Sequence, residues 1–126
     1  MNKNPFEMFN PPKNNEVPAA AQAGNLEDRI KALLGSSDVF LFMKGSPDAP
    51  QCGFSANTVG ILNQLGVQFK SFNILSDMDI REGVKRFSNW PTYPQLYVKG
   101  ELVGGNDIIT EMHESGDLEK MLSPYC

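Results

Sequence analysis

The feature that most constrains the fold is an unbroken run of five apolar residues, Val39 to Met43. A strand with one face in water alternates apolar and polar side chains, whereas a continuous apolar run is typical of a strand covered on both faces. A breaker-rich loop follows at 44–51, and then Val59, Leu62 and Leu65 return at helical spacing. This pattern predicts a buried sheet with helices packed against it.

Apolar spacing and turn residues predict the other elements. The first helix begins after Asn25, a suitable N-cap, and ends at Gly35. Lys99 and Gly100 read as the tight turn of a hairpin. The expected elements after the run at 39–43 are a helix ending at Gly66, a strand from 67 to 74, a helix marked by Ile80, Val84 and Phe87, strands at 96–98 and 101–103, a helix marked by Ile108, Ile109 and Met112, and a short last helix at 118–122.

The order α-β-α-β-α-β-β-α-α predicts an α/β fold. Because the early β-α-β unit implies parallel strands and the hairpin adds an antiparallel one, we expect a small central mixed sheet with helices on both faces. The length of 126 residues suits one domain, which we place at 25–126. Residues 1–24 are rich in Pro, Asn and Ala, and we expect them to be a disordered extension.

Charge and composition narrow the function. A net charge of −4 argues against sequence-independent binding to nucleic acid, which needs clustered Lys and Arg. The longest apolar run is too short to span a membrane, so we expect no membrane association. With two cysteines, Cys52 and Cys126, the chain is no disulfide scaffold, and a reducing, cytoplasmic setting is expected.

Cys52 is the candidate reactive residue. It lies where the loop ends and a helix begins, and a helix N-terminus stabilises the thiolate, the form that reacts and binds metals. Lys44, at the other end of the loop, can add positive charge. The alternative is that Cys52 is a small buried apolar residue.

Ser55 stands where a C-x-x-C redox pair has its second cysteine. A mixed disulfide on Cys52 therefore has no neighbouring thiol to resolve it, unless Cys126 folds back. We expect Cys126 to be dispensable, at a mobile chain end.

Three motifs carry a resemblance to a known family. KGSP at 44–47 followed by PQCGFS at 50–55, WPTYPQ at 90–95 and GGNDI at 104–108 are similar, in order and spacing, to the signatures of monothiol (CGFS-type) glutaredoxins. The similarity covers about residues 25 to 123. It implies a thioredoxin-like fold with a groove for glutathione.

The resemblance also implies how glutathione is held. Lys44 and Arg81 would meet the glycine carboxylate, while the Tyr93 backbone would pair with the cysteine part. Pro94 would be cis, which turns that backbone toward the ligand.

Asn106 and Asp107 would bind the γ-glutamyl end of glutathione. A helix N-terminus after Gly104 and Gly105 suits the α-carboxylate, and the Asp107 carboxylate suits the α-ammonium. The family usually has Cys or Ser at the position of Asn106, which puts that side-chain contact in doubt but leaves the backbone N–H.

The resemblance implies that the function is to bind a [2Fe–2S] cluster and to pass it to apo-proteins in iron–sulfur cluster assembly and iron homeostasis. Such a cluster takes about four thiolates. Two chains giving Cys52 and two glutathiones would supply them, so we expect a homodimer when the cluster is bound. The resemblance also implies pairing with BolA-type proteins.

Two other functions stay open. One is a weak glutathione-dependent thiol–disulfide oxidoreductase that removes glutathione from protein thiols. The other is a partner-binding domain without thiol chemistry.

Overall fold

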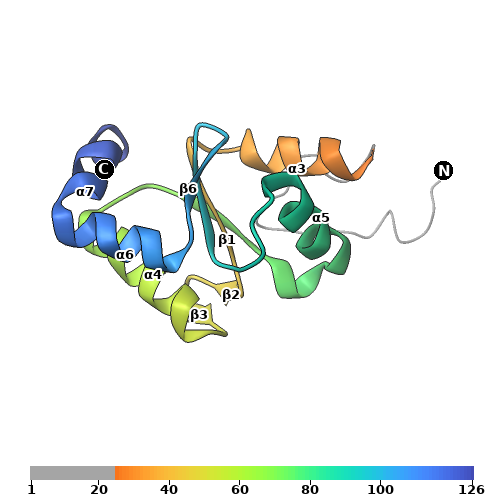
Figure 1. The fold of residues 1–126 in the computed structure, drawn as a ribbon, viewed down its shortest axis with the longest axis horizontal. Helices are drawn as coiled ribbons and strands as arrows, with labels where there is room; N and C mark the ends of the chain where they lie inside the picture. Colours follow the sequence, from red (N-terminus) through yellow and green to blue (C-terminus); the bar gives the residue numbers. More distant parts are fainter. Residues whose placement is uncertain (1–24) are drawn as a thin grey trace.

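The computed structural model describes residues 25–126. A four-stranded mixed sheet runs through its middle in the order β4-β1-β5-β6 (Figure 1). β1 (Val39–Met43) is parallel to β4 (Lys70–Asn73) and antiparallel to β5 (Gln95–Val98), which pairs antiparallel with β6 (Glu101–Gly104). The predicted α/β class and mixed sheet are confirmed, while the extension predicted at 1–24 lies outside the described residues.

Helices cover both faces of the sheet, as the apolar run at β1 predicts. α3 (Leu26–Leu34) and α5 (Met78–Ser88) lie on one side, and α4 (Gly53–Leu65), α6 (Asn106–Ser115) and α7 (Asp117–Leu122) lie on the other (Figure 1).

The five side chains of β1 are divided between two cores. Phe40 and Phe42 join the cluster under α3 and α5, whereas Val39, Leu41 and Met43 join the cluster under α4, α6 and α7. Successive side chains of a strand point to opposite faces, so a strand between two helical layers must be apolar throughout.

The hairpin between β5 and β6 turns as predicted. Lys99 and Gly100 both have positive φ, 51° and 82°, which is the geometry of a type I′ turn.

The predicted strand at 67–74 is too long at both ends. The Val67 N–H donates to the Leu62 carbonyl and the Gln68 N–H donates to the Tyr125 carbonyl, so these amides end α4 and hold the C-terminus instead of pairing in the sheet. At the other end, Ile74 begins a 3₁₀ helix, η1 (Ile74–Ser76), because the Asn73 side chain caps it by accepting from the Leu75 N–H.

Two further expectations differ in detail. The loop at 44–51 contains a small hairpin of β2 (Gly45–Ser46) and β3 (Ala49–Pro50). Phe87, predicted on the apolar face of its helix, is 39 % exposed, because that face is already covered through Ile80 and Val84.

The C-terminus was predicted to be mobile, but in the structure it is anchored. Residues 123–125 form a 3₁₀ turn, η2 (Ser123–Tyr125), and the Tyr125 carbonyl accepts from the Gln68 N–H at 2.8 Å. Gln68 lies just beyond the C-terminal end of α4, whereas Cys52 caps its N-terminal end.

No helix within residues 25–126 is long and apolar enough to cross a membrane.

Candidate functional site

Cys52 is the N-cap of α4, with extended backbone geometry, and it is partly buried. Burial raises the pKa of its thiol, but hydrogen bonds from the backbone N–H groups of Ser55 and Phe54 and from the Ser55 hydroxyl outweigh that effect. The positive charge of Lys44 adds to them, so the net pKa lies below that of an ordinary cysteine. The predicted helix-terminal setting of this thiol is present in the structure.

Ser55 has a structural role that was not predicted from the sequence. Its side chain is fully buried, and its Oγ accepts from the Lys44 N–H at 3.1 Å. The residue in the place of a second redox cysteine thus joins the first turn of α4 to the loop that carries Lys44.

The start of that loop is fixed by two more contacts. The Gly45 N–H donates to Asn73 Oδ1 at 2.9 Å, and the Gln51 N–H donates to the Lys44 carbonyl at 2.9 Å. Gly45 has φ 94°, and a Cβ there would lie 2.5 Å from the Ala49 carbonyl oxygen, so the loop needs glycine at this position. Lys44 is therefore held on a rigid turn at the edge of a groove.

The groove has a volume of about 530 Å³ and runs between the start of α4, α5, the 90–93 loop and the start of α6. Its lining includes these residues predicted from the sequence: Lys44, Arg81, Tyr93, Asn106 and Asp107. Cys52 itself is not among the lining residues, but Phe54, two positions after it, lines the groove and is 62 % exposed. Lys44, whose charge acts on the thiol, also lines the groove, so the thiol lies at its edge.

The groove is rich in positive charge. Lys85 lines it beside Lys44 and Arg81, and Asp107 is the single acidic residue among the lining residues. Lys85 was not among the residues predicted from the sequence, although it follows Arg81 by four positions and so shares its helix face. Lys85 is half-buried and lies 3.5 Å from Glu82, which leaves it close enough to the groove to meet an anion.

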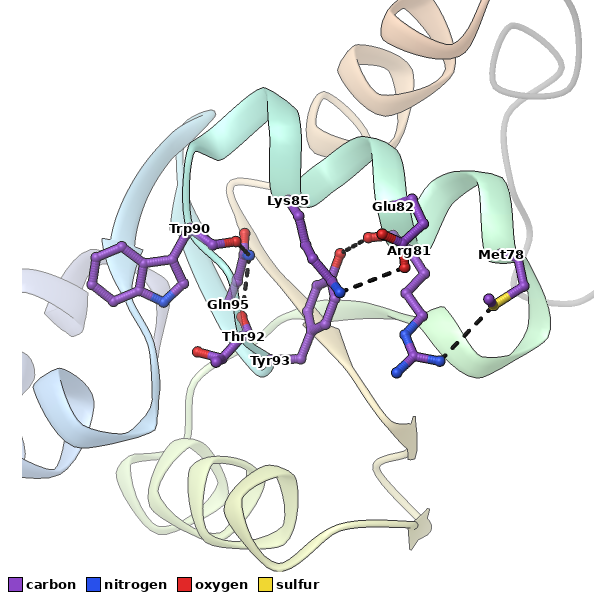
Figure 2. A network of polar contacts seen from close by, with 8 residues as sticks. All are labelled: Met78, Arg81, Glu82, Lys85, Trp90, Thr92, Tyr93 and Gln95. Atoms are coloured by element: carbon purple, nitrogen blue, oxygen red, sulfur yellow. Dashed lines mark hydrogen bonds and ion pairs between the residues drawn. The ribbon is translucent and has the colours of Figure 1, made fainter.

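Tyr93 lines one wall of the groove, whereas Pro94, also predicted from the sequence, is buried behind it and is not among the lining residues. The bond between them is cis, as expected, and the Tyr93 hydroxyl donates to the Arg81 carbonyl at 2.6 Å (Figure 2). Burial raises the pKa of this hydroxyl well above its usual range, so it remains a hydrogen-bond donor. The wall is thereby tied to α5.

Gln95 supports the Tyr93 wall from inside the protein. Its side chain is fully buried, and its Nε2 donates to the carbonyls of Trp90 at 3.1 Å and Thr92 at 3.2 Å (Figure 2). The Tyr97 hydroxyl donates to Gln95 Oε1 at 2.9 Å. The loop before Tyr93 is thus fixed by a satisfied buried amide.

Asn106 begins α6, but its side chain is engaged within the protein. Its Oδ1 accepts from Asn57 Nδ2 at 2.8 Å and from Thr58 Oγ1 at 3.1 Å, which joins α4 to α6. Gly105, the N-cap of α6, makes no side-chain cap, so the first N–H groups of the helix and the exposed Asp107 are what this end offers a ligand.

The described residues hold no group of three or more His, Cys, Asp or Glu side chains that could bind a metal ion. Within residues 25–126, a soft metal centre at the groove can therefore draw only on the Cys52 thiolate. The arrangement offers one activated thiol beside a mainly cationic groove, which suits a small anionic ligand.

Comparison with known proteins identifies the family. The family model described as Glutaredoxin matches residues 39–103. Monothiol glutaredoxin-S17 of Arabidopsis thaliana is 63 % identical over 99 residues, which are 79 % of this chain and 20 % of that protein. Probable monothiol glutaredoxin 2 of Rickettsia conorii is 54 % identical over 100 residues, which are 79 % of this chain and 90 % of the relative.

Longer relatives are matched only in part. Glutaredoxin-3 of Homo sapiens is 52 % identical over 101 residues, 80 % of this chain, and the match spans 30 % of that protein. The chain thus covers between a fifth and a third of these longer relatives.

Solved structures agree with the sequence relatives. The solution structure of reduced poplar apo GrxS14 has a TM-score of 0.70 at 45 % identity, covering 79 % of this chain and 91 % of that one. A monomeric truncated mutant of Trypanosoma brucei 1-C-Grx1 has a TM-score of 0.71 at 44 % identity, and the match covers 81 % of this chain and 93 % of that one. With its single CGFS cysteine, this chain belongs to the glutaredoxin family and, within it, to the monothiol glutaredoxins.

Proposed function

We propose that this domain binds glutathione in the groove and, as a dimer, carries a [2Fe–2S] cluster that it delivers to apo-proteins. One observation carries the proposal: a single activated thiolate, Cys52, lies at the edge of a cationic groove. The thiolate is a cluster ligand, and the groove can hold a second ligand that the protein lacks.

Glutathione matches the groove in its charges. It has two carboxylates, one ammonium and one thiol, and the groove has Lys44, Arg81 and Lys85 against Asp107. A glycine carboxylate would meet Lys44 and Arg81, while the γ-glutamyl end would meet Asp107 and the first N–H groups of α6. The Tyr93 backbone, between these two ends, would pair with the cysteine part.

The number of thiolates requires a second chain. A [2Fe–2S] cluster takes about four thiolate ligands, and each chain offers only Cys52 at the groove. Two chains and two glutathiones supply four, so the cluster would bridge a homodimer. The cluster is the cargo of the protein, to be passed to apo iron–sulfur proteins, and a BolA-type protein could take the place of the second chain. Because Cys52 must stay reduced, we place this activity in the cytoplasm.

The test is anaerobic reconstitution with iron, sulfide and glutathione. The wild-type protein should become coloured and dimeric when loaded, and it should be chiefly monomeric without the cluster. Cys52→Ser should abolish the ultraviolet–visible spectrum of the cluster, and Cys126→Ser is the matched control that should spare it. Removing free glutathione by gel filtration should destabilise the cluster. A cluster that forms normally on Cys52→Ser, or on a glutathione-free monomer, would overturn the proposal.

The lowered pKa of Cys52 also favours a second candidate, a slow glutathione-dependent oxidoreductase. The Cys52 thiolate would attack the glutathione sulfur of a mixed disulfide and release the protein thiolate, and a second glutathione thiolate would then resolve the Cys52 adduct as oxidised glutathione. A deglutathionylation assay on a glutathionylated protein measures this activity directly.

A further inference from the structure

Met78 lies against one of the groove cations. It is the first residue of α5, and Arg81 follows it by one turn on the same side of the helix. Side chains of a helix lean toward its N-terminus, which brings Arg81 back over Met78. The Arg81 Nη1 lies 3.9 Å from the Met78 sulfur (Figure 2).

This contact holds Arg81 only loosely. A thioether sulfur is a weak acceptor, so it positions the guanidinium without competing strongly with a carboxylate. Arg81 Nε is buried and has no hydrogen-bond partner among the described residues. Met78 is therefore the one side chain with which the described structure gives the guanidinium a hydrogen bond, and a change in its chemistry acts directly on a residue of the groove.

Met78 is also open to oxidants. Its side chain is 59 % exposed, whereas Met121, on α7, is 42 % exposed. Met43 is fully buried, and Met112 packs against the core. Among the methionines of residues 25–126, Met78 is thus the most accessible, and Met121 is an exposed comparison outside the groove.

We propose that Met78 is an oxidation site that lowers the affinity of the groove for its anionic ligand through Arg81. A peroxide transfers one oxygen atom to the Met78 sulfur: the O–O bond breaks, an S–O bond forms, the sulfur loses two electrons, and hydrogen peroxide leaves as water. The sulfoxide oxygen is a strong acceptor one bond beyond the sulfur. It accepts a hydrogen bond from the Arg81 guanidinium and competes with the ligand carboxylate for it.

This inference rests on the proposed binding of glutathione. Loss of one exposed cation–carboxylate contact corresponds to about a 1.4- to 5-fold weaker affinity. The change is reversible, because methionine sulfoxide reductases return the thioether with electrons from a thiol.

The experiment must keep oxidation away from the two thiols. Cys52 and Cys126 are first masked as mixed disulfides with methyl methanethiosulfonate, the protein is treated with hydrogen peroxide, and dithiothreitol then frees the thiols without reducing sulfoxides. Peptide mass spectrometry measures the oxidation of each methionine. Titration with reduced glutathione, followed by NMR, measures affinity. Met78→Leu is the test variant, and Met121→Leu is its matched control.

We expect oxidation at Met78 to exceed that at Met121 and to weaken glutathione binding about 1.4- to 5-fold. The loss should vanish in Met78→Leu, persist in Met121→Leu, and reverse with methionine sulfoxide reductases A and B. The Arg81 Nε–H resonance should also shift on oxidation without glutathione. An unchanged affinity of fully Met78-oxidised protein overturns the inference if Arg81→Ala still weakens binding. If Arg81→Ala has no effect either, the assignment of the groove to glutathione has failed instead.

Discussion

At the scale of single residues, Ser55 decides the state of the reactive thiol. Its backbone N–H and its hydroxyl both lower the pKa of Cys52, against the opposing effect of burial. A lower pKa means that the thiolate is present at lower pH, so alkylation by iodoacetamide should reach half its plateau rate below the pKa of a free cysteine, about 8.5. In Ser55→Ala that midpoint should move to higher pH, because the side-chain hydrogen bond is lost.

Ser115→Ala, at the far end of α6, is the control and should leave the alkylation profile unchanged. A wild-type midpoint at or above that of free cysteine would count against the geometry of the thiol site.

The groove cations give a second prediction at this scale. Lys44→Ala and Arg81→Ala should each weaken glutathione binding by about 0.2–1 kcal/mol, the usual value of an ion pair in contact with water, and the double variant should be weaker than either. Calorimetric titration measures this. Lys99→Ala, in the hairpin turn, removes a charge away from the groove and should have no effect. Wild-type affinity in the double variant would mean that the groove has been wrongly assigned.

Several residues that were predicted to act through their own chemistry are brought together by the fold. Lys44, Arg81 and Asp107 line the groove as their motifs imply. The tertiary contacts of Ser55 and Asn106 were not predicted, because Ser55 Oγ meets the Lys44 N–H, and Asn106 Oδ1 meets α4, only in the folded chain. No spacing rule relates such partners, whereas Lys85 could have been found from its spacing to Arg81.

At the scale of elements, Gln95 should decide how well the 90–93 loop is held. Gln95→Leu leaves the Tyr97 hydroxyl and two loop carbonyls without their partner, and a lost hydrogen bond with a buried group left unsatisfied costs about 1–3 kcal/mol. We expect that decrease in the free energy of unfolding in urea, and weaker glutathione binding, since the Tyr93 wall loses its support.

Tyr97→Phe removes the hydroxyl contacts to Gln95 Oε1 and Ser88 but keeps Gln95 Nε2 on the two loop carbonyls, so its effect on the loop should be smaller. NMR shifts of the 90–93 amides separate the two variants: they should be large in Gln95→Leu and small in Tyr97→Phe. Equal stability and unchanged loop shifts in Gln95→Leu would contradict this account.

Elements with a local signal were predicted, and those fixed by distant partners were not. The residues of β1, and those of the turn at Lys99 and Gly100, are enough by themselves to predict the local structure. The start of β4 could not be predicted in this way, because the Gln68 amide pairs with Tyr125, more than fifty positions away in the chain.

At the scale of the whole molecule, α4 keeps the two cysteines apart. Its 13 residues span about 20 Å, with Cys52 at one end and the anchored C-terminus beside Gln68 at the other. A disulfide needs Cα atoms within about 7 Å. After treatment with oxidised glutathione, mass spectrometry should therefore show a glutathione adduct on Cys52 and no dominant Cys52–Cys126 disulfide. A dominant intramolecular disulfide would require the C-terminus to detach, which the Tyr125 contact opposes.

The groove also ties the ligand to the stability of the entire domain. Its walls come from separate segments, including the loop at Lys44, α5, the 90–93 loop and the start of α6, so no part of the chain forms the groove alone. A ligand that binds only the folded chain adds about 2.7 kcal/mol to the free energy of unfolding at a concentration one hundred times its Kd. The thermal midpoint therefore becomes a reporter of occupancy, and a substitution deep in either core can lower apparent affinity simply by reducing the fraction of folded molecules.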